Sequence, residues 1–353
     1  MFWNWGILML PKFDWLLILP VFLLLSFSFF ILNSVSSSLF PAYYWYFGLG
    51  IAAFLFFSLF DFEILSAFYK YFYFISILLL LTTLVIGQVT RGTVRWIPIG
   101  SISIQSSEIV RPFLLIFFAK FLTKEKLNLK RLIRVIILMA IPLFLILVQP
   151  SLGVAVLTGI GFMGLFLASE LDKKYFLFLG IIIILLLPLI YLFLQPYQKT
   201  RINAFINPSM DPQGVGYNAI QSTISVGSGK LLGRGLGRGV GTQLAFLPEH
   251  HTDFIFASVA EEMGFVGAIV LLLLTFFLFV RIINYTENSV SISARLFLGG
   301  LFLTLFAQTV IHVGMNMGLF PITGLPYPLV SAGGSSLLAT MTALGMVTGS
   351  RRR

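Results

Sequence analysis

Very few side chains in this sequence could act as an acid or a base, and the most suggestive one ends a polar stretch. Asp253 closes the run LPEHHTD that begins at Leu247, and apolar residues follow from Phe254 onward. A carboxylate at such a junction of water and hydrocarbon could accept a proton as a general base. The same residue also fits a helix N-cap, where an anion gains about 0.3–1 kcal/mol from the helix dipole.

Two carboxylates follow on the same expected helix, but they cannot act as a pair with Asp253. Glu261 and Glu262 lie eight and nine residues later, which is about 12 Å along a helix. A retaining glycosidase needs two carboxyl groups about 5–5.5 Å apart. We expect these glutamates to form interhelical hydrogen bonds or ion pairs, although an ionisable residue inside a membrane is also a functional candidate.

Cationic side chains dominate the stretch before Asp253. Residues 195–252 contain Asp211 and Glu249 against five cations, which are Lys199, Arg201, Lys230, Arg234 and Arg238. An anionic ligand such as a pyrophosphate suits this excess of positive charge. The glycine-dense run 227–241 lacks the spacing of a phosphate-binding loop, so it also fits a flexible loop that meets lipid headgroups.

A second group of polar residues lies earlier in the chain. Glu108 and Arg111 are three positions apart in an otherwise apolar segment, so they can pair on one helix face. The pair could be purely structural, or it could face a cavity in which Arg111 binds a phosphate and Glu108 orients it. Arg91 and Trp96 lie just ahead, and a Trp at a membrane interface is more often an anchor than a ligand platform.

The composition places all these residues in a membrane protein. The chain of 353 residues is 58% hydrophobic and 10% charged, with a mean hydropathy of +0.98, whereas soluble domains are roughly 45–50% apolar and about 25% charged. This excludes a water-soluble protein, intrinsic disorder and nucleic-acid binding. The absence of cysteine excludes disulfides, thiolate zinc sites and Cys nucleophiles but gives no information about the compartment.

Ten segments are long and apolar enough to cross a membrane, which needs about 20 residues each. We therefore predict an all-α polytopic membrane protein with a single domain over residues 1–353. The predicted spans are Trp15–Leu32, Ala42–Phe60, Tyr71–Gln88, Gln105–Leu122, Leu132–Val148, Leu152–Ala168, Tyr175–Leu194, Asp253–Val280, Leu296–Met317 and Tyr327–Gly349.

The distribution of positive charge predicts the orientation. With both termini in the cytoplasm, fifteen of the 23 Lys and Arg residues fall in cytoplasmic loops, as the positive-inside rule requires. Residues 195–252 then form one long outer loop between the seventh and eighth spans, with an amphipathic stretch near 217–226. A loop of this length is usually functional or disordered.

The C-terminal part contains two more patterns. Residues 316–328 predict a Gly/Pro-rich outer turn, and the small residues 331–336 predict close helix packing. Gln308, His312 and Asn316 recur every four positions, so they form a polar stripe that interhelical hydrogen bonds would explain.

Taken together, these motifs resemble the SEDS family (shape, elongation, division and sporulation) over nearly the whole chain, and its elongation members more than its division members. The resemblance is strongest at five places, namely 91–98, 105–108, 149–153, 196–267 and 316–336. The sequence departs from the family pattern at Ser106, Arg111, Ser151 and Ala332, where Pro, Lys, Asp and an aromatic residue are common.

The resemblance implies a peptidoglycan glycosyltransferase that polymerises lipid II on the outer face of the bacterial cytoplasmic membrane. It implies Asp253 as the catalytic residue and Arg91, Trp96, Glu108 and Arg201 as substrate-binding residues. We add Arg111 and Lys199 to the substrate-binding residues, because both are cations close to these positions. The implied partners are lipid II, the growing glycan strand, membrane lipid and a class B penicillin-binding protein. No cofactor is required; a divalent cation could assist, although no ligand cluster supports one. A lipid II flippase and a non-catalytic scaffold are the alternatives.

Overall fold

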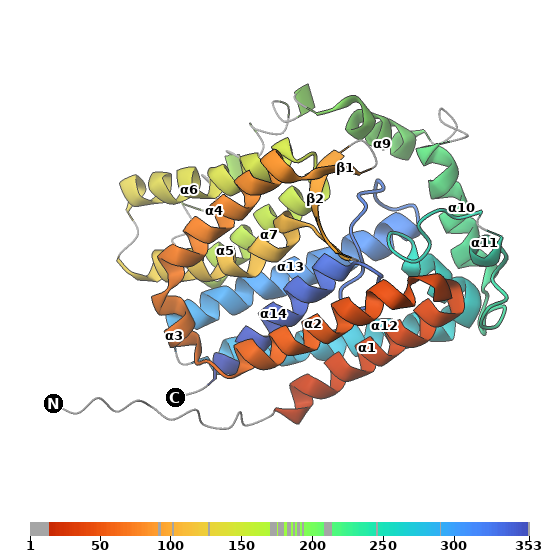
Figure 1. Cartoon of the computed structure of the whole chain (residues 1–353), viewed down its shortest axis with the longest axis horizontal. Helices are drawn as coiled ribbons and strands as arrows, with labels where there is room; N and C mark the ends of the chain where they lie inside the picture. The colour runs from red at the N-terminus through yellow and green to blue at the C-terminus, as the bar shows by residue number, and fades with distance from the viewer. Residues whose placement is uncertain are drawn as a thin grey trace.

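The protein is a bundle of helices whose two ends differ. The computed structural model describes residues 14–351 apart from 91–92, 101, 126–127, most of 170–193, 208–213, 245 and 290. The first and last described residues, Asp14 and Arg351, lie together at one end of the bundle, with Arg351 Nη1 3.8 Å from Asp14 Oδ2, and we call it the terminal end. Helices α9 (Pro196–Ile206), α10 (Val215–Ser228) and α11 (Val240–Gln243) lie at the opposite end, which we call the loop end (Figure 1).

Among the described residues, six helices are long and apolar enough to cross a membrane. They are α1 (Trp15–Val35), α2 (Phe40–Ser58, extended by the 3-10 turn Ser37–Leu39), α4 (Tyr69–Ile86), α6 (Leu129–Val148), α12 (Ile255–Glu287) and α13 (Ile292–Asn316). Three further helices coincide with predicted spans, namely α5 (Ser106–Thr123), α7 (Leu152–Ala168) and α14 (Gly334–Gly349). The seventh predicted span, 175–194, falls mostly outside the described residues. The prediction of an all-α polytopic membrane protein is confirmed.

Helix α5 lies in the middle of the bundle. Most of its side chains are buried, and it packs against α4, α7, α13 and α14. Its environment is therefore other helices rather than lipid, which explains how it tolerates charged residues. The short helix α3 (Phe62–Ala67) connects α2 and α4 at the terminal end.

A small antiparallel sheet replaces the simple loop predicted after the third span. It consists of β1 (Gln88–Thr90), β2 (Thr93–Ile99) and β3 (Ile102–Ile104), in that order. Trp96 pairs with Gln88 across β1 and β2, and Ile97 pairs with Ile104 across β2 and β3. Threonine, valine and isoleucine make up eight of the thirteen residues in these strands, as is usual for pleated surfaces.

The long polar stretch is largely folded rather than structureless. The predicted amphipathic segment 217–226 lies within α10, which confirms it. A small apolar cluster of Leu247, Phe254, Ala257 and Ile322 joins the end of this stretch to the start of α12.

The tenth predicted span begins later than expected. Helix α14 starts at Gly334 rather than Tyr327, because the preceding residues form a non-helical segment, 317–333, that is exposed over 317–320 and largely buried from Leu325 to Ser331. Three prolines there lack the amide hydrogen that a helix needs. Gln308 Nε2 donates to the Pro326 carbonyl at 2.7 Å, and His312 Nδ1 contacts the Leu325 carbonyl at 2.7 Å. The polar stripe of α13 makes the interhelical bonds predicted for it, since Gln308 bonds to Arg111 of α5 and Ser336 of α14 and Asn316 accepts the Ala257 amide of α12. It also binds the 317–333 segment, which the sequence did not predict.

Candidate active site

Asp253 lies in a tight turn just before α12. The carbonyl of Glu249 accepts the amides of Thr252, Asp253 and Phe254 at 3.0, 3.0 and 3.2 Å, and Glu249 itself has a positive φ of 55°. The N-cap of α12 is Phe254, with no side-chain capping bond. The prediction of Asp253 as a helix cap is therefore wrong, because the turn ends one residue later than the sequence suggested.

Buried groups of α13 and the 317–333 segment fix the backbone of this turn. Asn316 Nδ2 donates to the Asp253 carbonyl at 3.1 Å, and Ser331 Oγ donates to the Thr252 carbonyl at 2.7 Å. The Ala332 amide donates to the His251 carbonyl at 2.9 Å. The side chain of Asp253 is half-buried. These bonds fix the backbone from which the Asp253 side chain extends.

Arg201 and Asp253 approach each other above Gly324. Arg201 Nη1 donates to the Ile322 carbonyl at 3.2 Å. A Cβ atom built on Gly324 would lie 3.3 Å from Asp253 Oδ2 and 3.6 Å from Arg201 Nη1, so the two charged groups are within about 7 Å of each other. Gly324 has a φ of +71°, a conformation that glycine adopts without steric cost. Only a glycine leaves this space open.

A tyrosine and a second arginine lie beside Arg201. Burial raises the pKa of Tyr197, while the charges of Arg201 and Arg95 and a hydrogen bond from Gln198 partly offset that rise. Both guanidinium groups therefore act electrostatically on the Tyr197 hydroxyl, which donates to the Pro150 carbonyl at 2.7 Å. The sequence did not single out Arg95 and Tyr197 as site residues, because neither strand β2, which positions Arg95, nor helix α9, which positions Tyr197, was predicted.

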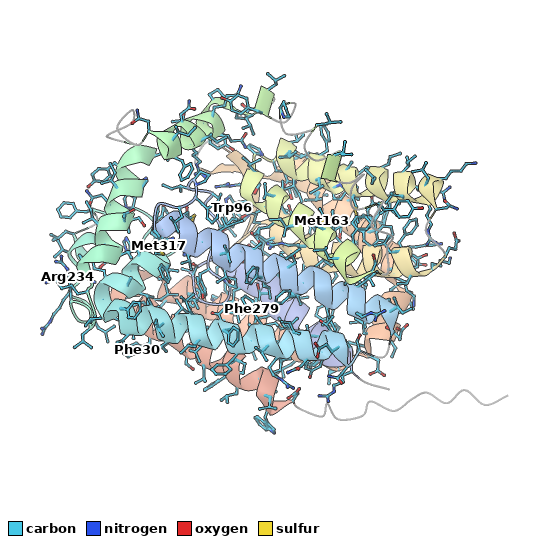
Figure 2. The ribbon with its side chains drawn as sticks, turned by 180° about the vertical axis from the view of Figure 1, so that it is seen from behind. Phe30, Trp96, Met163, Arg234, Phe279 and Met317 are labelled. Carbon is cyan, nitrogen blue, oxygen red and sulfur yellow. The ribbon has the colours of Figure 1, made fainter. Side chains whose placement is uncertain are left out.

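The other predicted binding residues lie in different places. Lys199 Nζ turns back to the Leu192 carbonyl at 3.4 Å and lies 5.5 Å from the centre of the Tyr191 ring. Trp96 is half-buried on β2 (Figure 2), and its side chain points to the opposite face from its neighbour Arg95 because side chains alternate along a strand. Arg91 lies outside the described residues.

Glu108 and Arg111 form the predicted pair, and both are buried in the centre of the bundle. Arg111 Nη1 also donates to Gln308 Oε1 at 3.2 Å, and the same Gln308 binds the Pro326 carbonyl. The pair is thus connected through one side chain to the segment that carries Gly324. Neither residue lines the cavity described next.

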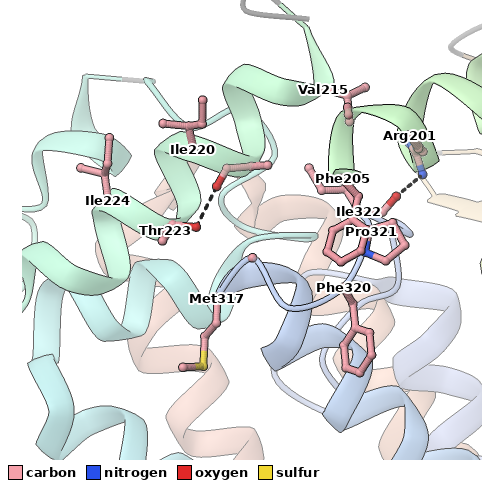
Figure 3. A pocket seen from close by; sticks show the side chains of 13 residues that line it. Arg201, Phe205, Val215, Ile220, Thr223, Ile224, Met317, Phe320, Pro321 and Ile322 are labelled. Atoms are coloured by element: carbon pink, nitrogen blue, oxygen red, sulfur yellow. Dashed lines mark hydrogen bonds between the residues drawn. The ribbon is translucent and has the colours of Figure 1, made fainter. Parts of the chain in front are cut away.

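An apolar cavity of about 350 Å³ opens next to Arg201 (Figure 3). Its walls come from α9, α10 and the start of the 317–333 segment, with Phe205, Ile220, Ile224 and Met317 among the lining residues. Among the described residues that line it, Arg201 is the only charged one. The cavity therefore fits an apolar chain that carries a negative group at one end.

Within the described part of the chain, no three side chains of His, Asp or Glu gather as metal ligands. The site thus combines one carboxylate, two arginines and an apolar cavity at the loop end of a multi-pass membrane protein. This arrangement is suited to a transfer reaction in which a base removes one proton and cations stabilise a phosphate leaving group.

The chain belongs to the FtsW, RodA and SpoVE family of cell cycle proteins, whose family model matches residues 7–352. The peptidoglycan glycosyltransferase MrdB of Escherichia coli is 36% identical over 280 residues, covering 78% of this chain and 76% of MrdB. A probable peptidoglycan glycosyltransferase FtsW of Wigglesworthia glossinidia brevipalpis is 35% identical over 312 residues, covering 84% and 80%.

Solved structures agree with this assignment over almost the full length. One similar chain comes from a study of how a peptidoglycan synthase complex coordinates polymerization and crosslinking. It matches with a TM-score of 0.82 at 29% identity, and the match covers 96% of this chain and 97% of that chain. The rod shape determining protein RodA of Thermus thermophilus matches with a TM-score of 0.72 at 27% identity, covering 96% of both chains.

Proposed function

We propose that this chain polymerises lipid II into glycan strands, with Asp253 as the catalytic base. The chain acts as a peptidoglycan glycosyltransferase in the determination of cell shape, as the names of its relatives indicate. The observation that carries the assignment of the base is the meeting of Asp253 and Arg201 above Gly324. The Asp253 carboxylate can accept a proton there while the Arg201 guanidinium binds a phosphate.

In the proposed reaction, a GlcNAc hydroxyl of one lipid II attacks the anomeric carbon of a lipid-linked MurNAc. A bond forms between the hydroxyl oxygen and that carbon, and the bond from the carbon to the phosphate oxygen breaks with inversion. Asp253 takes the hydroxyl proton. Undecaprenyl pyrophosphate leaves without a general acid, because Arg201 and Arg95 stabilise its charge.

The remaining predicted residues have more distant roles in this proposal. The apolar cavity next to Arg201 fits the first part of a prenyl chain whose phosphate lies at the arginine. Glu108 and Arg111 act as positioning residues, because Gln308 links them to the segment below the site. Trp96, Arg91 and Lys199 remain candidates for binding the sugar or peptide part of the substrate.

The loop end faces the outside of the bacterial cytoplasmic membrane in this proposal, and both termini face the cytoplasm. The distribution of Lys and Arg along the sequence supports this orientation. A class B penicillin-binding protein is the proposed partner. The similar chain from a complex that coordinates polymerization and crosslinking supports it.

The test uses the purified full-length chain in liposomes with lipid II, with or without the partner. Asp253→Asn removes the base but keeps the size of the side chain, and we expect no glycan polymer on a gel. Glu249→Gln is the matched control, since it removes a carboxylate from the same turn, and it should keep polymerisation within a few-fold of the unchanged chain.

Two results would support the alternatives. If Asp253→Asn polymerised normally but unfolded at a lower temperature, Asp253 would be only structural, as in a scaffold. If the unchanged chain made no polymer but moved fluorescent lipid II between leaflets, the chain would be a flippase.

A further inference from the structure

The regular hydrogen bonding of helix α12 is interrupted near the loop end, and backbone groups of the glycine-rich stretch 227–241 bond to the helix there. Gly264 has non-helical angles, with φ 68° and ψ −163°. The amides of Phe265 and Val266 donate to the carbonyls of Lys230 and Leu231 at 2.9 and 3.2 Å. In return, the amides of Arg234 and Gly235 donate to the carbonyls of Glu261 and Glu262 at 2.9 and 3.0 Å. Backbone groups freed by the break are thus satisfied by residues 230–235.

The two buried glutamates anchor the same stretch. Glu261 Oε1 accepts the Gly241 amide at 2.9 Å, and Glu262 Oε2 accepts the Ser34 hydroxyl of α1 at 2.5 Å. The interhelical bonding predicted for them therefore holds for both, since Glu262 binds α1 and Glu261 binds Gly241 of α11. A Cβ on Gly233 would lie 2.1 Å from the Glu262 carbonyl oxygen. The glycines thus allow backbone to pack directly on backbone, and this part of the predicted flexible loop is instead fixed.

Residues 230–238, which we call the 230–238 loop, expose apolar and cationic side chains together. Leu231, Leu232 and Leu236 are 68, 79 and 44% exposed, and Lys230, Arg234 and Arg238 are also exposed. Figure 2 shows Arg234 extending from the edge of the molecule at the loop end. Glu261 and Glu262, which bind this stretch and α1, are only 2 and 1% exposed, so the charged side chains that the loop itself exposes are all positive.

The hydrogen bonds to α12 fix the level of this loop relative to the membrane. Phe265 and Val266, to which it is bonded, are themselves 58 and 50% exposed on a membrane-spanning helix. From Met263 to Val280 the sequence has no charge, and 18 residues span about 27 Å, close to the roughly 30 Å of a hydrocarbon core. The break at Gly264 therefore lies at one boundary of the hydrocarbon, and the loop lies at that boundary too.

We propose that the 230–238 loop binds anionic phospholipid in the adjacent leaflet. The three leucines enter the acyl-chain region, and Lys230, Arg234 and Arg238 bind headgroup phosphates. An open hollow of about 600 Å³ among residues 228–234 gives a headgroup access to Lys230 and Arg234. Exposed leucines beside cations are typical of surfaces that lie in a membrane interface. The proposed orientation makes this the outer leaflet, but the lipid contact does not depend on the activity.

The absence of cysteine from the chain permits a direct test. Leu232→Cys in the full-length chain is labelled with the fluorophore NBD and reconstituted into nanodiscs of phosphatidylcholine with 30% phosphatidylglycerol. We expect blue-shifted emission that is quenched when the lipids carry brominated acyl chains. Asn203→Cys, exposed on α9, is the matched control and should keep the emission of a label in water.

The choice of lipid is tested with the same labelled protein. At equal mole fraction, brominated phosphatidylglycerol should quench the label at position 232 more strongly than brominated phosphatidylcholine. About 1 kcal/mol per cation corresponds to roughly fivefold enrichment each. The triple variant Lys230→Gln/Arg234→Gln/Arg238→Gln should make the two lipids quench equally. A water-like, unquenched label at position 232 would overturn the proposal, and equal quenching in the unchanged loop would overturn the preference for anionic lipid.

Discussion

Replacing Gly324 with alanine tests whether Asp253 and Arg201 act together at this site. The substitution has two separate effects. Alanine at φ +71° costs about 1–2 kcal/mol of stability, because the left-handed region is unfavourable for a residue with a Cβ. The new methyl group would also lie 3.3 Å from Asp253 Oδ2 and 3.6 Å from Arg201 Nη1.

The second effect is the one that should reduce activity. A contact of 3.3 Å is tight, so the carboxylate must move by a few tenths of an ångström. Because a misplacement of about 1 Å can cost 10²-fold in rate, a shift of this size should lower kcat about five- to tenfold. Stability alone cannot cause that loss if the variant remains folded at the assay temperature.

Gly100→Ala separates the two effects. Gly100 also has a positive φ, +59°, but a Cβ there meets no atom within 4 Å. Both variants should lower the thermal midpoint in detergent by similar amounts, whereas only Gly324→Ala should slow lipid II polymerisation in liposomes. Equal activities of the two variants at equal folded fractions would refute the idea that Asp253 reacts from its position above Gly324.

Three further substitutions test other parts of the molecule. Arg201→Ala should lower kcat/KM for lipid II by about 10²-fold, as loss of one charge-stabilising donor does. Arg201→Lys should recover part of the lost kcat/KM. An unchanged kcat/KM in Arg201→Ala would show that Arg201 does not bind the phosphate. Glu108→Gln leaves Arg111 buried without an opposite charge, so it should destabilise the protein by about 3–5 kcal/mol, seen as a lower thermal midpoint, and adding Arg111→Met should restore part of the loss. At the terminal end, burial raises the pKa of Asp14, but hydrogen bonds from Tyr285 and Arg281 outweigh it and hold the pKa below its usual value. The carboxylate therefore stabilises the fold above the ordinary Asp pKa and loses this effect as pH falls through the lowered one, so Asp14→Asn should flatten the acid side of a profile of thermal midpoint against pH.

The membrane-spanning helices could be predicted from the sequence because each one needs a long, largely apolar run, whereas the short helices α3, α9 and α11 could not. Prediction was weaker where backbone groups are satisfied by distant side chains. The late start of α14 depends on Gln308 and His312 binding carbonyls of the 317–333 segment, and a hydropathy pattern contains no information about such bonds. The β2 strand was missed for a related reason, since it is short and its pairing residues lie in a region read as a connecting loop.

The candidate site was predicted in part. Asp253 and Arg201 were both singled out, and the structure brings them together. The contribution of Gly324 was not predicted, because it depends on a close approach between segments 71 residues apart. Glu108 and Arg111 were predicted to pair and do so, but the sequence left open whether they face a cavity. Helical spacing determines which side chains can meet, and only the packing of the bundle determines what else they contact.

The non-helical segment 317–333 explains how such distant residues can affect one reaction. Its first residues line the apolar cavity, Gly324 lies against Asp253 and Arg201, and the Pro326 carbonyl binds Gln308, which in turn binds Arg111. Its last residues hold the turn that contains Asp253. We therefore expect a change at the buried pair to shift the segment and misplace Asp253, the proposed base, without any contact with substrate. Such a change should lower kcat more than it alters KM, whereas a change in the cavity wall should mainly raise KM.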